Sequence, residues 1–205
     1  MNDMHTPHAK RWAALIGLFT LGTLLLRIYL STVELGGITE AIVNLSRFFT
    51  IWTNCLVMVV MLRIGFGTVP ASANWINTAV TSIIGVGLIY HTLLAHLIDP
   101  QGLALFADHG VHTIVPLAGM VWWICFGYKT ELNFKQPFIW ALWPMFYSVV
   151  TLVRSHFSTI YPYPFLDVLT YGYPQVGLNI VGLSIGFVVI GCALVLLARV
   201  LKTQR

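Results

Sequence analysis

The chain alternates long apolar runs with short connections that carry glycine, proline or aromatic residues. A helix that crosses a bilayer needs about 20 consecutive apolar residues, and runs of this length recur along the whole sequence. No internal repeat, low-complexity tract or long linker divides the chain. The pattern predicts an all-α, polytopic membrane protein, a six-helix bundle with a single domain over residues 1–205. Its predicted spans lie at about 12–31, 44–63, 75–97, 110–128, 137–156 and 176–198.

Composition narrows the class of protein. Hydrophobic residues make up 58% of the 205 residues and charged residues only 9%, whereas about a quarter of the residues in a soluble domain are charged. The 11 Lys and Arg residues are scattered singly instead of forming a stripe, which excludes a nucleic-acid partner. The three cysteines lie inside apolar runs without a CxxC pair, a pattern that favours neither a disulfide nor a metal site. We therefore expect no metal and no cofactor.

Charged residues near the ends of the predicted spans sort by side. Lys and Arg are retained on the cytoplasmic side of a membrane, and here they occupy the two ends of the chain and every second connection, while Asp and Glu occupy the others. We predict that both ends are cytoplasmic and that the chain is an integral multi-pass protein, in the cell (inner) membrane if prokaryotic. The cations are Lys10, Arg11, Arg63, Lys129, Lys135, Arg199, Lys202 and Arg205, and the opposite acids are Glu34, Glu40, Asp99, Asp108 and Asp167.

Polar residues inside the spans fall at one depth once this orientation is applied. With a rise of about 1.5 Å per residue, every span delivers at least one of them to the outer half of the membrane. An ionisable group in hydrocarbon is costly unless it faces a bundle interior or a wet cavity, so such groups mark candidate functional sites. Structural explanations compete with this one, because arginines near span ends reach headgroups and asparagines bond between helices. The layer includes Arg27, Arg47, Thr50, Asn54, His91, His112, Arg154 and Asn179.

Within this layer, Thr50 and His112 suggest nucleophilic chemistry. A hydroxyl is a poor nucleophile until a base takes its proton, and imidazole, with an ordinary pKa of about 6.5, suits that task near neutral pH. An attacked ester develops an oxyanion, and because N–H groups inside a helix are already paired, we expect side chains to bind it. Asn54, one turn from Thr50, is the first candidate. Arg47 and Asn179 follow it, and Arg27, Arg154 and His91 are further candidates for binding a substrate that carries a carboxylate as well as an ester.

Short segments carry a family resemblance. They are Phe49-Thr50 with Asn54, the run Asp108-His109-Gly110-Val111-His112-Thr113 leading to Pro116, and Tyr161-Pro162-Tyr163-Pro164-Phe165-Leu166-Asp167. The first two resemble the androgen-induced-protein family of six-span membrane proteins, although Asp108 stands where we expect Asn in the animal members. The third is similar to its prokaryotic branch. The resemblance implies a threonine hydrolase of fatty acid esters of hydroxy fatty acids, with Thr50 as nucleophile and His112 as the catalytic histidine, and with Thr53 as the alternative nucleophile.

Two other classes of function stay open. His91 and His112 are predicted at similar depth on successive spans, which would suit a b-type haem and electron transfer. A transporter, or a protein that binds lipid without catalysis, is the other class, although neither inverted repeats nor broken helices are evident. The hydrolase implies a lipid ester as partner and a pocket whose mouth faces the outer leaflet. The acyl chain length and the oligomeric state stay open.

Overall fold

The computed structural model describes residues 3–68, 71–130 and 132–203, and these residues form helices without any strand. Six segments are long and apolar enough to cross a membrane, which confirms the predicted six-span, all-α architecture: Pro7–Leu35, Phe49–Phe66, Ala73–Leu97, Leu103–Phe126, Gln136–Ser158 and Val168–Leu201. The α-helices are α1 (Pro7–Leu35), α2 (Ile38–Leu45), α3 (Phe49–Phe66), α4 (Ala73–Ile89), α5 (Leu103–His109), α6 (Val115–Phe126), α7 (Gln136–Trp140), α8 (Leu142–Ser158) and α9 (Val168–Thr203). Two π-helical turns, η2 (Tyr90–Leu94) and η4 (Gly110–Ile114), and three 3₁₀ turns, η1 (Asp3–His5), η3 (Ala95–Leu97) and η5 (Pro164–Leu166), complete the described elements.

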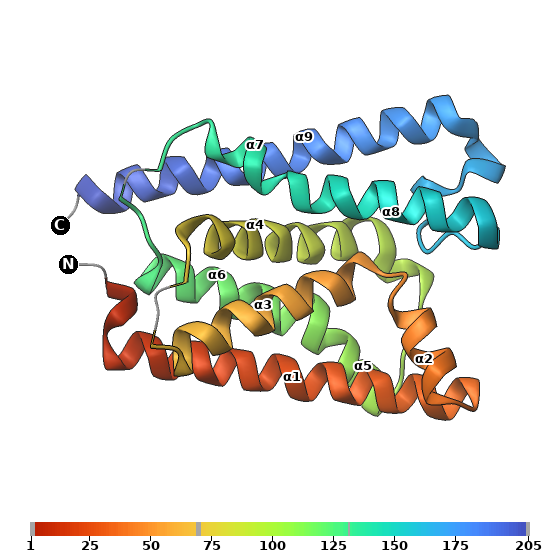
Figure 1. Cartoon of the computed structure of the whole chain (residues 1–205), viewed down its shortest axis with the longest axis horizontal. Helices are drawn as coiled ribbons and strands as arrows, with labels where there is room; N and C mark the ends of the chain where they lie inside the picture. The colour runs from red at the N-terminus through yellow and green to blue at the C-terminus, as the bar shows by residue number, and fades with distance from the viewer. Residues whose placement is uncertain (1–2, 69–70, 131, 204–205) are drawn as a thin grey trace.

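The spanning segments lie side by side, and successive ones run in opposite directions (Figure 1). Helix α4 contacts α3, α6, α7 and α9, and its segment is the most buried of the six, whereas the segment of α9 is the least buried. Helix α1 begins and α9 ends at the same end of the bundle (Figure 1). The cytoplasmic placement of this terminal end stays a prediction. Arg205 lies outside the described residues, and so does the side chain of Lys202.

The second predicted span, 44–63, is not one helix. Helix α2 ends at Leu45 and α3 begins only at Phe49. At the break, side chains donate hydrogen bonds to backbone carbonyl groups. The Trp52 indole donates to the Ser46 carbonyl oxygen over 2.8 Å, and the Tyr147 hydroxyl donates to the Arg47 carbonyl oxygen. A carbonyl bonded by a side chain does not need a helical partner, so the chain can turn here. As a result Thr50 lies in the first turn of α3.

Helix α9 begins earlier than predicted, at Val168 instead of about residue 176. The Asp167 carboxylate caps it, accepting hydrogen bonds from the Leu169 N–H over 2.9 Å and from the Thr170 hydroxyl over 2.7 Å. The bonds from Thr170 hold the pKa of Asp167 below its usual value. Gly172, at φ 74°, then kinks the helix just before Pro174. This capped start fixes the end of the connection 159–167, whose Tyr163 lies beside Thr50.

Candidate functional site

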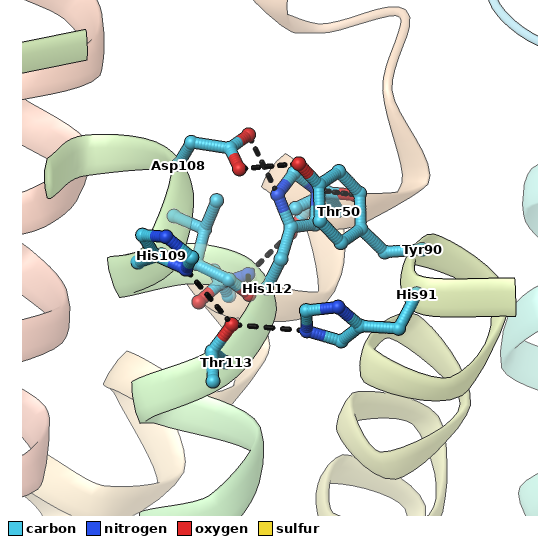
Figure 2. Close-up of polar contacts among 9 residues, drawn as sticks. Thr50, Tyr90, His91, Asp108, His109, His112 and Thr113 are labelled. Carbon is cyan, nitrogen blue, oxygen red and sulfur yellow. Dashed lines mark hydrogen bonds and ion pairs between the residues drawn. The ribbon is translucent and has the colours of Figure 1, made fainter. Parts of the chain in front are cut away.

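Three buried side chains form a hydrogen-bonded chain at the end of the bundle opposite the termini. The Thr50 hydroxyl lies 3.2 Å from Nε2 of His112, and Nδ1 of His112 lies 3.0 Å from Oδ1 of Asp108. The three residues are 8%, 9% and 2% exposed, respectively. Figure 2 shows them between the start of α3 and the α5–η4 segment. The structure therefore brings together the predicted nucleophile and base, and adds a carboxylate.

The hydrogen bonds indicate which atoms of Thr50 and His112 carry protons. The Thr50 hydroxyl can donate to Nε2 only if that nitrogen is unprotonated, and the proton on Nδ1 then donates to Asp108, which as a carboxylate only accepts. The Tyr90 hydroxyl donates to the second oxygen, Oδ2, over 2.5 Å. The Tyr90 ring also stacks on the imidazole, with ring centres 3.8 Å apart and planes 5° apart. The imidazole is thus held at one face and at both nitrogens.

Asp108 and Tyr90 are the residues that the sequence analysis missed. Asp108 was expected in a connection outside the spans, and this expectation is wrong because α5 starts at Leu103 and the carboxylate is buried. Its spacing of four residues from His112 was the available signal, since residues four apart share a helix face. Tyr90 gave no comparable signal because it belongs to a different segment.

The segments that carry the stacked rings of Tyr90 and His112 are π-helical at the site instead of α-helical. Tyr90 begins η2, and His112 lies in η4. Pro116 accounts for η4, because it lacks the N–H group that would bond to the His112 carbonyl in an α-helix. Gly87 lets the two segments approach, since a Cβ there would lie 3.3 Å from that carbonyl oxygen. Such π-helical turns are frequent at functional sites because they redirect side chains.

The start of α3 offers backbone N–H groups as candidate oxyanion donors. The sequence analysis expected the N–H groups near Thr50 to be paired inside a helix, and this is wrong. The first N–H groups of a helix have no partner within it and lie at the positive end of the helix dipole. Phe49 and Thr50 are the first two residues of α3. The phenol of Tyr163, from the connection 159–167, interacts with the Thr50 side chain and with both N–H groups. Burial raises the pKa of Tyr163, and these interactions oppose that rise.

Asn54, the predicted oxyanion donor, makes a different contact. Its buried amide nitrogen donates to the Thr50 carbonyl oxygen over 2.8 Å and to the Val111 carbonyl oxygen over 3.2 Å. It therefore ties α3 to η4 and lines neither cavity beside Thr50. Within the described part of the chain, its oxygen Oδ1 has no hydrogen-bond partner. Thr53, the alternative nucleophile, accepts a bond from the Trp143 indole over 3.3 Å instead of meeting His112.

Two cavities meet at Thr50. The larger cavity, of about 250 Å³, also contacts His112, Asp108 and Arg27. The smaller cavity, of about 40 Å³, is mostly apolar and contacts neither His112 nor Asp108. Thr50, Tyr90, Leu94 and Tyr163 line both.

Arg27 is the predicted arginine that the structure places at the site. It lines the larger cavity, and its charge acts on Asp108 and Tyr90. Its Nε is buried and has no hydrogen-bond partner among the described residues. Among the described residues the only acid–base side-chain contact within 4.0 Å joins His112 and Asp108, so no carboxylate lies within that distance of the Arg27 guanidinium.

The remaining predicted residues lie elsewhere. Arg154 donates to the Ser46 hydroxyl over 2.8 Å and to the Val43 carbonyl oxygen over 2.7 Å, beside Arg47 in a separate small pocket. Exposed His91 bonds through Nε2 to the Thr113 hydroxyl over 3.0 Å (Figure 2). Asn179 donates to the Phe165 carbonyl oxygen over 2.9 Å and so holds the connection 159–167 on α9. These four line neither cavity beside Thr50.

Comparison of the chain with protein-family models, with curated proteins and with solved structures gives no match. Within the described part of the chain, no group of three or more His, Cys, Asp or Glu side chains is placed to hold a metal ion. The function must therefore be inferred from the site itself.

Proposed function

We propose that this protein is an intramembrane lipid ester hydrolase in which Thr50 is the nucleophile and His112 the general base. The hydrogen-bonded chain Thr50–His112–Asp108 is the observation that carries the proposal. A nucleophile bonded to a base, and that base bonded to an orienting carboxylate, is the arrangement that activates a hydroxyl. The family resemblance, which implies these roles for Thr50 and His112, supports the same chemistry.

The geometry suggests how each group acts. His112 takes the Thr50 proton through Nε2 as the hydroxyl oxygen attacks the ester carbon. Asp108 then stabilises the imidazolium and keeps the ring in the required tautomer. The N–H groups of Phe49 and Thr50, at the positive end of α3, can stabilise the oxyanion. Collapse of the intermediate releases the alcohol, which takes its proton from His112, and a water then cleaves the acyl group from Thr50.

The proposed substrate is a lipid ester that also carries a carboxylate, because Arg27 lines the larger cavity beside the catalytic pair. Guanidinium groups bind carboxylates through strong, charge-assisted hydrogen bonds. Fatty acid esters of hydroxy fatty acids, which the family resemblance implies, belong to this class. The six apolar spans suit a membrane protein, and such lipids dissolve in the membrane.

The haem alternative fits the site poorly. Both ring nitrogens of His112 are hydrogen bonded, to Thr50 and Asp108, and an axial ligand would have to release one of them. His91 bonds to Thr113 instead of facing His112. A lipid-binding or transport role without catalysis needs the cavities alone, so a test of the hydrolase must detect chemistry.

Purified protein in detergent tests the proposal directly. We expect a fluorophosphonate probe to label the wild type and a chromogenic ester to be hydrolysed. Thr50→Ala should abolish labelling, and both Thr50→Ala and His112→Ala should lower kcat by about 10³-fold. Thr53→Ala is the matched control. Thr53 accepts a bond from Trp143 instead of meeting His112, so this variant should keep both probe labelling and ester hydrolysis. Full activity in both Thr50→Ala and His112→Ala would refute the hydrolase, and an inert wild type that still binds lipid would favour the non-catalytic role.

A further inference from the structure

Two arginines lie close together outside both cavities of the candidate site. Arg47 belongs to the break between α2 and α3, and Arg154 belongs to the last turns of α8. Helix α2 and the end of α8 lie at the end of the bundle opposite the chain termini (Figure 1). Both arginines line one small pocket with the hydroxyl-bearing residues Ser46, Thr151 and Ser155. The positive charge of Arg47 acts on Arg154, and since guanidinium groups keep their charge in proteins, the two repel each other.

No acidic side chain offsets the charges of this arginine pair. Among the described residues, no carboxylate lies within 4.0 Å of either guanidinium. Arg154 donates to the Ser46 hydroxyl and to the Val43 carbonyl oxygen, which are neutral acceptors and use two of the five N–H groups of a guanidinium. The buried Nε of Arg47 has no hydrogen-bond partner within the described part of the chain. Because unpaired charges near a membrane are costly, the pair is suited to an anion that the described residues do not supply.

The charge of the pair indicates the kind of anion. Two guanidinium groups carry two positive charges, and each presents parallel N–H groups that match two oxygen atoms. A carboxylate has one negative charge and two oxygens, so a single arginine already matches it. A phosphomonoester has a charge of about −1.5 to −2 near pH 7 and three strong acceptor oxygens. It is therefore the common biological anion that best matches two arginines.

The surroundings of the pair suit a lipid that carries this group. Arg47 lies just before the second apolar spanning segment and Arg154 lies near the end of the fifth, and cationic side chains at span ends reach the lipid headgroups. Phe157, one turn after Arg154 in α8, is 82% exposed. Ile160, which lines the same pocket, and Val43 are also exposed. Exposed apolar side chains beside two cations fit a ligand that joins a phosphate group to acyl chains.

We propose that Arg47 and Arg154 form a binding site for the phosphomonoester headgroup of an acidic lipid such as phosphatidic acid. The acyl chains of this lipid lie along the exposed apolar side chains of α2 and α8. The phosphate joins the break before α3 to the end of α8, and so stabilises the fold at this end of the bundle. The site lies outside both cavities beside Thr50, and the inference does not depend on the proposed ester hydrolysis.

Titration of the purified full-length protein in a neutral detergent tests the site, with dioctanoyl phosphatidic acid as the probe at about pH 7.5, where its phosphate is mostly a dianion. We expect Arg47→Gln to raise Kd at least about tenfold, because it removes charge-assisted hydrogen bonds. Dioctanoyl phosphatidylcholine, whose headgroup is neutral overall, should bind at least about tenfold more weakly than the acid. Dioctanoyl phosphatidylglycerol, a phosphodiester with a single charge, should bind at least about threefold more weakly.

The rise in Tm that the lipid causes separates binding from a purely structural role. Arg154→Gln also removes bonds to Ser46 and Val43, so its Tm should be lower without lipid, and the rise on adding phosphatidic acid should be lost as well. A purely structural arginine would lower Tm and leave that rise intact. Arg47→Gln provides the same test if Arg154→Gln does not fold. Arg63→Gln is the matched control, because Arg63 is exposed in the last turn of α3, at the other end of that helix, and it should leave Kd unchanged.

Four results would overturn the inference. Equal affinity for phosphatidylcholine would exclude an anion site, and equal affinity for phosphatidylglycerol would exclude selection of a phosphomonoester. Inorganic phosphate at the same concentration should not raise Tm, and an equal rise would show that the ligand is free phosphate instead of a lipid. An unchanged Kd for phosphatidic acid in folded Arg47→Gln and Arg154→Gln proteins would place the lipid elsewhere.

Discussion

The bundle has buried polar contacts at both ends, but the two sets differ in kind. At the terminal end, the fully buried Trp123 indole donates to the side-chain oxygen of buried Asn77 over 2.7 Å, and the buried Trp140 indole donates to that of exposed Asn74 over 3.5 Å. At the opposite end, His112 joins Thr50 to Asp108. The first set contains only neutral donors and acceptors with nothing to transfer. The second contains a proton donor, a titratable base and a carboxylate in series.

The same helical segments contribute to both ends, which makes the comparison sharper. Helix α4 carries Asn77 in a regular turn and leads into η2 at Tyr90, and α6 carries Trp123 and follows η4, which holds His112. Burial and hydrogen bonding are therefore common to the polar groups at both ends of the bundle. The irregular turns and the adjoining cavities distinguish the end of the bundle that holds the candidate site.

Of the changes considered for the two ends of the bundle, removing the charge of Asp108 should have the largest effect on kcat. In Asp108→Asn the amide can donate to Nδ1 of His112, which leaves the proton on Nε2 and prevents this nitrogen from accepting the Thr50 proton. We expect kcat for a short-chain ester to fall about 10²-fold with KM nearly unchanged. Steady-state kinetics of the purified variant measures both.

Asp99→Asn is the matched control for that experiment. Asp99 is exposed and accepts a bond from Gln101 in the connection before α5, so its amide should leave kcat unaltered. Equal activity of Asp108→Asn and the wild type would show that the carboxylate does not orient the histidine.

At the terminal end, by contrast, a substitution should lower the stability of the fold and leave hydrolysis nearly unchanged. Asn77→Leu leaves the buried Trp123 indole N–H without its acceptor, and an unsatisfied buried donor costs about 1–3 kcal/mol. We expect a Tm in detergent lower by about 3–8 °C, while kcat changes less than about twofold. Thermal unfolding and ester hydrolysis, measured on the same sample, check the two halves of this prediction.

Asn74→Leu is a second variant at the terminal end. The hydrogen bond that Asn74 accepts from Trp140 is longer, at 3.5 Å, so Tm should fall less than for Asn77→Leu. A large loss of kcat in a folded Asn77→Leu protein would contradict the distinction between the two ends.

Part of this picture was predictable from the sequence because it depends on local patterns. Bilayer-length apolar runs gave the six spans, and the shared depth of Thr50 and His112 gave the pair that the structure joins. The break between α2 and α3 was not predictable, since its carbonyl groups are bonded by Trp52 and by Tyr147, which is 100 residues from Arg47. The placement of Thr50 in the first turn of a helix, where N–H groups have no partner within the helix, depends on that distant contact.

The arginines show the limit of depth as a guide. Arg27, Arg47 and Arg154 were predicted in one layer, yet only Arg27 lines the larger cavity. Depth fixes the position of a residue along a helix axis but not the neighbours toward which its face turns, and those follow from packing. Arg154 turns to Ser46 and Val43, which lie more than a hundred residues earlier in the chain.

Arg27 provides the smallest and most selective test. It lines the larger cavity at the end of the bundle that holds the candidate site, and no carboxylate among the described residues forms an ion pair with it. Arg27→Gln should raise KM about tenfold for an acetate ester of a hydroxy fatty acid, whose carboxylate loses its partner, and leave KM for a neutral acetate ester unchanged. Arg154→Gln, which changes a guanidinium outside both cavities, should alter neither value. An equal rise for the neutral ester would mean that Arg27 supports the shape of the cavity and does not bind the anion.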